Sequence, residues 1–213
     1  MKVGVLGTGE VGRVLSDGFL RKGHEVMRGT REPAKLKEWR HAAGHRAGVG
    51  SFAEAAAYGA IVVLAVKGAA AEAVIGACGS ALDGKVVIDT TNPIAEAPPT
   101  AGVLSFFTGP NDSLLERLQR KAPGAQLVKA FSCVGSALMV DPKVKGGRPT
   151  MFICGDETAA RQHVADLLDT FGWDVEDLGA AAAARAIEPL CMLWCIPGFL
   201  RSDWAHAFKL VRP

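Results

Sequence analysis

Three glycines near the start of the chain have the spacing of a phosphate-binding turn. They form the pattern G-x-G-x-x-G directly after the short apolar run Val3–Leu6, and an amphipathic segment follows. In such a strand–turn–helix unit the first glycine permits the tight turn, the second lets a diphosphate approach the backbone, and the third lets the helix pack on the sheet. The free N–H groups at the helix start then face the anion. The pattern predicts dinucleotide contacts from Gly7, Thr8, Gly9, Glu10, Val11 and Gly12.

The end of the second predicted strand indicates which dinucleotide binds. An NAD site usually places Asp or Glu about 20 residues after the glycines, where the carboxylate bonds the ribose hydroxyls. Here the strand His24–Arg28 ends in Gly29-Thr30-Arg31, without a carboxylate at its tip. Thr30 offers a hydroxyl, Arg31 a planar set of donors, and Lys35 a further cation one turn into the next helix. We expect a pocket for the 2′-phosphate of NADP; the alternative is that both cations are solvated surface charges.

Small and polar residues follow three later predicted strands, where a ligand crevice lies in parallel sheets. The strands are Ala60–Val66, Lys85–Asp89 and Gln126–Ala130. The predicted coenzyme contacts at their ends are Ala65, Val66, Lys67, Asn92, Pro93 and Ala130. Ser132 and Cys133 are candidates for lining the site of the hydride acceptor, although Cys133 could equally pack as a small apolar side chain. No catalytic triad, carboxylate pair or metal-ligand cluster is evident in the sequence.

Predicted strands and helices alternate along the whole chain, which favours right-handed crossovers and a parallel sheet. Ala60–Val66 is apolar throughout, as is typical of a central strand buried on both faces. No boundary rich in Pro, Ser or charge divides the chain. We therefore predict a single α/β domain over residues 1–213, a Rossmann-type doubly wound and mostly parallel sheet. Its core spans 1–145, and a C-terminal β/α extension spans 146–213 and ends in helices from Gly179 onward, interrupted near Pro197.

Composition argues against nucleic-acid and membrane binding. The 24 basic and 22 acidic residues are interspersed and leave a formal charge of +2. Met1 leads directly into the first strand, and the apolar stretch Ile187–Leu200 is too short to span a bilayer. Five cysteines without paired spacing are typical of reduced thiols. We expect a cytoplasmic protein without a metal site.

The stretch Ile187–Leu200 also predicts self-association. Its apolar residues lie around much of a helix, which is more apolar surface than one sheet face should cover. They are Ile187, Leu190, Cys191, Leu193, Trp194, Ile196, Phe199 and Leu200. We expect a homodimer formed through these C-terminal helices.

Several motifs together resemble the deazaflavin (coenzyme F-420):NADP oxidoreductase family, and the likeness covers nearly the whole chain. The motifs are Gly7–Gly12, Gly29–Arg31, Asp89–Pro93, Lys129–Phe131, Arg148–Thr150 and Trp204–Lys209. The family is similar in turn to the cytosolic NADPH domain of the six-transmembrane ferric reductases. The resemblance implies hydride exchange between NADP(H) and a flavin or deazaflavin ring, in a small dimer-forming protein.

Departures from the family pattern leave the acceptor open. Many relatives have Pro-Trp or similar where this chain has Lys67-Gly68, and Asn or His followed by Thr where it has Ser132-Cys133. Direct hydride transfer needs ring stacking and exclusion of water, with little acid–base machinery. The alternatives are an NADP(H)-binding redox sensor without turnover, and an imine or hydroxyacid reductase of the 6-phosphogluconate-dehydrogenase-like superfamily.

Overall fold

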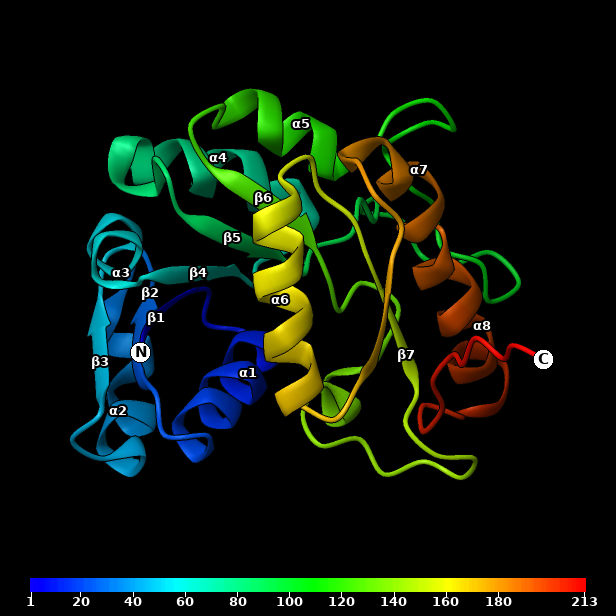
Figure 1. The fold of residues 1–213 in the computed structure, drawn as a ribbon, viewed down its shortest axis with the longest axis horizontal. Coiled ribbons are helices and arrows are strands. Elements are labelled where there is room, and N and C mark those ends of the chain that lie inside the picture. The colour runs from blue at the N-terminus through cyan, green and yellow to red at the C-terminus, as the bar shows by residue number, and fades with distance from the viewer.

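A computed structural model describes all residues, 1–213, and its centre is a six-stranded parallel sheet (Figure 1). The strand order is β3-β2-β1-β4-β5-β6, so the order reverses between β1 and β4. The strands are β1 (Lys2–Leu6), β2 (Glu25–Gly29), β3 (Ala47–Gly50), β4 (Ile61–Leu64), β5 (Val86–Asp89) and β6 (Gln126–Lys129). Ligands bind at this kind of reversal in open α/β sheets. The predicted doubly wound α/β fold is confirmed.

Helices cover both faces of the sheet because every strand buries side chains on both sides (Figure 1). One face packs against α1 (Glu10–Arg21), α2 (Lys37–Ala43) and α6 (Thr158–Thr170). The other face packs against α3 (Phe52–Tyr58), α4 (Gly68–Cys78), α5 (Leu114–Lys121) and α7 (Ala184–Ile187). Short 3-10 turns occupy Pro33–Leu36, Gly79–Leu82, Ser136–Leu138 and Ala181–Ala183. Two apolar layers therefore hold the sheet rigid beneath its ligand-binding edge.

Strand register sets the carboxyl ends side by side. Leu6 lies opposite both Gly29 and Leu64, and Leu64 lies opposite Asp89. Asp89 in turn lies opposite Lys129 at the end of β6. The turns after β1, β2, β4, β5 and β6 consequently meet along one edge of the sheet, as the sequence predicts.

The C-terminal extension has its own small sheet. Strands β7 (Thr150–Ile153) and β8 (Asp174–Asp177) pair in parallel with each other. They connect to the main sheet through one antiparallel bridge between Lys129 and Cys154. The extension thus lies beside β6.

The predicted terminal helix is wrong in two places. Pro197 lies inside α8 (Leu190–Arg201), and the interruption falls earlier, at Glu188-Pro189 between α7 and α8. Pro189 has no N–H to continue the hydrogen-bond ladder, so the ladder is interrupted there, although Glu188 and Pro189 both keep helical backbone angles. Residues 202–213 are not helical, because Ser202 adopts a left-handed conformation with φ of 55° and turns the chain away. This tail then packs beside β7, where the Thr150 N–H donates to the carbonyl of Phe208 at 2.9 Å.

The helical stretch from Ala181 to Arg201 is longer than the sequence suggests. It has 21 residues, and an 18-residue window within it has a mean hydropathy of 1.3, which meets the length and composition of a membrane span. The prediction that this region is too short to span a bilayer therefore underestimates the helix, since it begins before Ile187. Buried core helices meet the same criterion, and 33% of this window is buried in the molecule.

Candidate coenzyme and acceptor site

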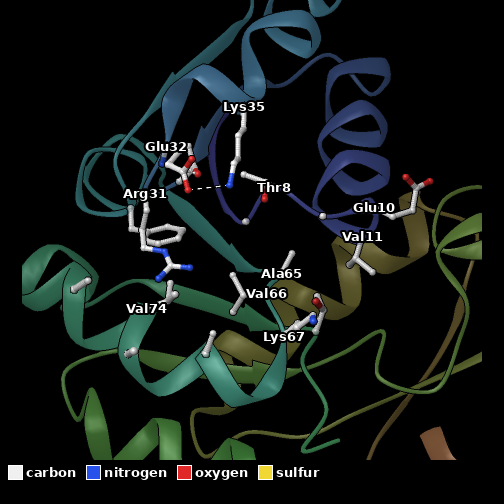
Figure 2. A pocket seen from close by; sticks show the side chains of 18 residues that line it. Thr8, Glu10, Val11, Arg31, Glu32, Lys35, Ala65, Val66, Lys67 and Val74 are labelled. Carbon is white, nitrogen blue, oxygen red and sulfur yellow. Dashed lines mark hydrogen bonds and ion pairs between the residues drawn. The ribbon is translucent and has the colours of Figure 1, made fainter. Parts of the chain in front are cut away.

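A cavity of about 710 Å³ lies between the glycine turn, the tip of β2 and helix α4 (Figure 2). It sits where the strand order reverses, which is the expected position for a dinucleotide. Its lining consists of Gly7, Thr8, Gly9, Glu10, Val11, Thr30, Arg31, Glu32, Lys35, Phe52, Ala65, Val66, Lys67, Ala70, Ala73, Val74, Ala77 and Thr90. Most residues predicted to contact the coenzyme are therefore gathered in one place.

Four predicted contacts lie outside this cavity. Gly12 is buried beneath the turn, and Pro93 and Ala130 are buried as well. Asn92 lines a neighbouring cavity. Contact of these four residues with the coenzyme stays a prediction.

The first two glycines of the turn serve different needs. Gly7 has a φ of 138°, and a side chain there would overlap the carbonyl oxygen of Ala65, so the fold itself requires glycine. Gly9 has an ordinary φ of −72°, and no atom lies within 4 Å of where its Cβ would be. The fold would accept a larger residue at Gly9, whereas a diphosphate against the backbone would not. The empty space above Gly9 thus fits the group that the sequence predicts.

Two cations reach the end of the cavity near β2 (Figure 2). Arg31 is exposed and forms no ion pair within the chain, so its guanidinium is free to bind a phosphate. The Lys35 ammonium lies 2.8 Å from a carboxylate oxygen of Glu32, and this contact holds the pKa of Glu32 below its usual value. A carboxylate therefore does stand near the strand tip, contrary to the prediction, because Glu32 directly follows Arg31 and also lines the cavity.

An apolar slot lies beside these cations. Phe52 from α3 and Ala73, Val74 and Ala77 from α4 form it. Figure 2 shows Arg31 extending toward Val74, so a planar base in the slot would lie next to the guanidinium. The sequence reasoning missed these residues, since they belong to helix surfaces without any motif.

A second cavity of about 400 Å³ adjoins the first and shares Val66, Lys67 and Thr90 with it. It lies between the start of α4 and the loop after β5. Its other lining residues are Gly68, Ala69, Thr91, Asn92, Ile94, Ala95, Glu96 and Ala97. A ligand here would lie next to the inner end of the first cavity, so the two cavities together can hold a coenzyme and an acceptor side by side.

The predicted acceptor residues Ser132 and Cys133 lie deeper than expected. Each is 3% exposed, and neither lines the two cavities described above. The carbonyl of Ser132 accepts a hydrogen bond from the Asn92 amide at 2.8 Å, so this segment supports the cavity wall from behind. Burial raises the pKa of the Cys133 thiol to about 12, which keeps it protonated at neutral pH.

A buried ion cluster supports the same wall. The Lys129 ammonium lies 2.5 Å from Asp89 and 2.8 Å from Glu188, and it donates to the carbonyl of Thr91 at 2.8 Å. Burial opposes the charge, yet the two carboxylates raise the pKa of Lys129 above its usual value. Glu188 also accepts from the N–H groups of Leu114 and Leu115 at the start of α5. The cluster thereby joins the loop after β5 to the junction of α7 and α8.

Comparison with known proteins agrees with this geometry. Residues 2–93 match the family described as coenzyme F-420-dependent NADP oxidoreductase. A solved structure from Arthrobacter sp. FB24, provisionally assigned as an F-420-dependent NADP reductase, shares 34% identity over the full length of both chains with a TM-score of 0.91. The chain belongs to this family. As a member of the F-420-dependent NADP oxidoreductases, it is an NADP-dependent oxidoreductase.

More distant relatives of this family member differ in their acceptors. The metalloreductase STEAP3 of Rattus norvegicus is 29% identical over 209 residues, which is 93% of this chain and 39% of the relative. The chain thus spans about two fifths of the length of that metalloreductase. An imine reductase from Streptomyces aurantiacus shares 18% identity with a TM-score of 0.68, over 94% of this chain and 63% of the other. At that identity the likeness shows the shared fold alone.

Proposed function

We propose that the protein transfers a hydride between NADPH and a planar deazaflavin (F-420) or flavin ring. The observation that carries the proposal is the pair of adjoining cavities, which share a wall of Val66, Lys67 and Thr90. When bound, NADPH supplies the hydride, and the chain must bind, orient and shield the two rings. The first cavity accounts for the coenzyme, and the second gives the acceptor a place beside it.

The shared wall suits a ring acceptor. Val66 and Thr90 offer a small, weakly polar surface for stacking, and the exposed Lys67 adds a positive charge. A ring that accepts a hydride gains negative charge, which a nearby ammonium stabilises. Glu96, from the loop after β5, lines the second cavity together with Lys67, and no cluster in the chain has the composition of a metal site.

The primary test is NADPH oxidation with a panel of acceptors: F-420, free flavins, ferric chelates, cyclic imines and hydroxyacid precursors. The expected result is the highest kcat/KM with a tricyclic ring. Faster turnover of an imine or simple carbonyl would contradict the proposal and favour the small-substrate reductase. Tight NADPH binding without reduction of any acceptor would favour the redox sensor.

Two variants on helix α4 distinguish the roles of the two cavities. Ala69 lines only the second cavity and Ala73 only the first, and both are exposed on α4. Ala69→Phe should raise the KM for the acceptor and leave the Kd of NADPH unchanged. Ala73→Phe should raise the Kd of NADPH and leave the KM for the acceptor unchanged. If Ala69→Phe has no effect on any acceptor, the second cavity is not the acceptor site.

We further propose that the protein forms a homodimer through α8 and the tail. Leu193, Phe199, Leu200 and Trp204 are each at least 43% exposed. The Phe199 and Trp204 rings pack edge to face at 5.3 Å, so these two exposed side chains form one apolar surface. A second copy would cover it, as the apolar face of α8 predicts.

Sedimentation at micromolar concentration tests the homodimer. Leu193→Asp should yield a monomer, whereas Leu178→Asp, an exposed apolar position after β8, should leave a dimer. A monomeric wild-type protein would contradict the proposal. We also propose a cytoplasmic location, in keeping with five free and buried cysteines; cell fractionation tests it.

A further inference from the structure

A buried arginine lies directly beneath the glycine turn. Arg28 is on β2, is 1% exposed, and is among the largest fully buried side chains. One nitrogen of its guanidinium donates to the carbonyl of Gly7 at 3.1 Å and to the carbonyl of Gly9 at 3.3 Å. Both carbonyls belong to the turn that lines the coenzyme cavity.

A second layer of side chains holds Arg28 in place. Its guanidinium lies 4.9 Å from the ring centroid of Trp39 on α2. The Trp39 indole donates to Asp17 on α1 at 2.8 Å. Burial lowers the pKa of Arg28 to about 10, with Asp17 acting against this effect, so the group is still charged at neutral pH. A buried cation is costly, so its place under the turn calls for a reason.

The geometry of the peptide bond supplies that reason. In a trans peptide the C=O of one residue and the N–H of the next point in opposite directions. Carbonyls of Gly7 and Gly9 that point down at Arg28 therefore direct the N–H groups of Thr8 and Glu10 up toward the cavity. Neither N–H has an acceptor within the chain. These are the donors that a diphosphate on the turn would use.

We propose that Arg28 is a positioning residue for the coenzyme diphosphate: it fixes the two carbonyls, aims the two N–H groups, and places a positive charge beneath the anion. The inference rests on the coenzyme site described above. It assigns Arg28 a role different from that of Arg31, which would contact the 2′-phosphate at the other end of the cavity.

The test compares NADPH with adenosine 2′-monophosphate, which has the 2′-phosphate and no diphosphate. Arg28→Met should weaken NADPH binding by about tenfold to a hundredfold, because the turn loses the donor that orients its N–H groups and the diphosphate loses the positive charge beneath it. Binding of adenosine 2′-monophosphate should change less than about twofold. Arg28→Lys retains the charge, so its Kd for NADPH should lie between those of the wild type and Arg28→Met.

A matched core variant separates positioning from damage to the fold. Val26→Ala removes buried volume two residues earlier on the same strand and does not contact the turn. It should lower the unfolding temperature and leave the ratio of the two affinities unchanged. Should Arg28→Met fail to fold, Arg28→Lys carries the same comparison.

Three results would overturn the inference. The first is an unchanged Kd of NADPH in the Arg28 variants. The second is an equal loss of affinity for NADPH and for adenosine 2′-monophosphate. The third is the same change in the ratio of these two affinities in Val26→Ala. A wild-type protein that binds neither ligand would instead refute the coenzyme site itself.

Discussion

The proposed coenzyme side and the proposed acceptor side of this molecule are built in different ways. The coenzyme cavity is formed by a glycine turn, a strand tip and the surface of α4, all within the first 90 residues. The second cavity is lined by residues 66–97, but its wall is held by distant segments, since Lys129 donates to the carbonyl of Thr91 and pairs with Asp89 and Glu188. Local backbone shape therefore defines one half of the site, and a buried charge cluster supports the other. The two halves should respond differently to mutation.

The largest expected effect is on the acceptor side. Lys129→Met leaves Asp89 and Glu188 buried without their cation, so the free energy of unfolding should fall by about 3–5 kcal/mol at pH 7. Urea unfolding followed by tryptophan fluorescence measures it. Lys85→Met is the matched control, because Lys85 donates to three carbonyls and faces no carboxylate. Equal losses in both variants would show that the cluster has no special role.

The same variant has a predicted pH dependence. The pKa of Lys129 is raised above its ordinary value of 10.5, so its stabilising contribution is fully present below that pH. The contribution is lost as pH rises through the folded-state pKa. The stability difference between wild type and Lys129→Met should thus stay constant from about pH 7 to 9 and narrow only in stronger alkali. A difference that already narrows near pH 8 would contradict the assigned charge state.

The sequence predicts which residues gather at the first cavity, because the signals there are local. The glycine turn and the cation Arg31 each act within a few residues of their position. Helix starts are also set locally: Ser51 before α3 and Ser113 before α5 each accept a hydrogen bond from the N–H three residues later.

The other features need the folded chain. The Lys129 cluster joins residues up to about 100 positions apart, and no pattern marks such a contact in advance. Arg28 reads as an ordinary strand residue until β2 is placed beside the turn. The non-helical tail also escaped prediction, because packing against β7 outweighs the apolar composition that favours a helix there.

The next-largest effect is expected in the first cavity and concerns its affinity for NADPH. Arg31→Ala should weaken NADPH binding by about 10- to 150-fold, the equivalent of about 1.5–3 kcal/mol, and leave NADH binding nearly unchanged. The reason is that the unpaired guanidinium has an anionic partner only in NADP(H). Quenching of tryptophan fluorescence gives both dissociation constants. Wild-type protein that binds NADH as tightly as NADPH would exclude the 2′-phosphate pocket.

A smaller effect is expected at the second glycine. Gly9→Ala fits the fold, since its φ is ordinary and its Cβ site is open, and removal of glycine should leave stability equal or slightly higher. NADPH binding should weaken about tenfold because the methyl group occupies the diphosphate position. Gly7→Ala is the contrast, and it should reduce stability itself. Unchanged NADPH affinity in Gly9→Ala would show that the diphosphate does not bind at this turn.

The smallest expected effect is an increase in NADPH affinity. Glu32 pairs with Lys35 at the 2′-phosphate end, so Glu32→Gln frees the ammonium for the ligand. NADPH affinity should rise by about two- to fivefold at low salt, and the gain should shrink as salt screens the exposed charges. Glu38→Gln, which removes a carboxylate from α2 outside the cavity, is the control. Equal gains from both variants would indicate a general charge effect.

The most direct test of the account follows a deuterium label from the coenzyme to the acceptor. The protein is mixed without oxygen with oxidised F-420 and with NADPH that carries deuterium at both nicotinamide C4 positions, and the reduced deazaflavin is analysed by mass spectrometry. Direct transfer between rings in adjoining cavities predicts one deuterium on the deazaflavin ring carbon for each NADPH oxidised, without exchange with solvent. Loss of the label to water, or bound NADPH that never reduces the ring, would contradict it.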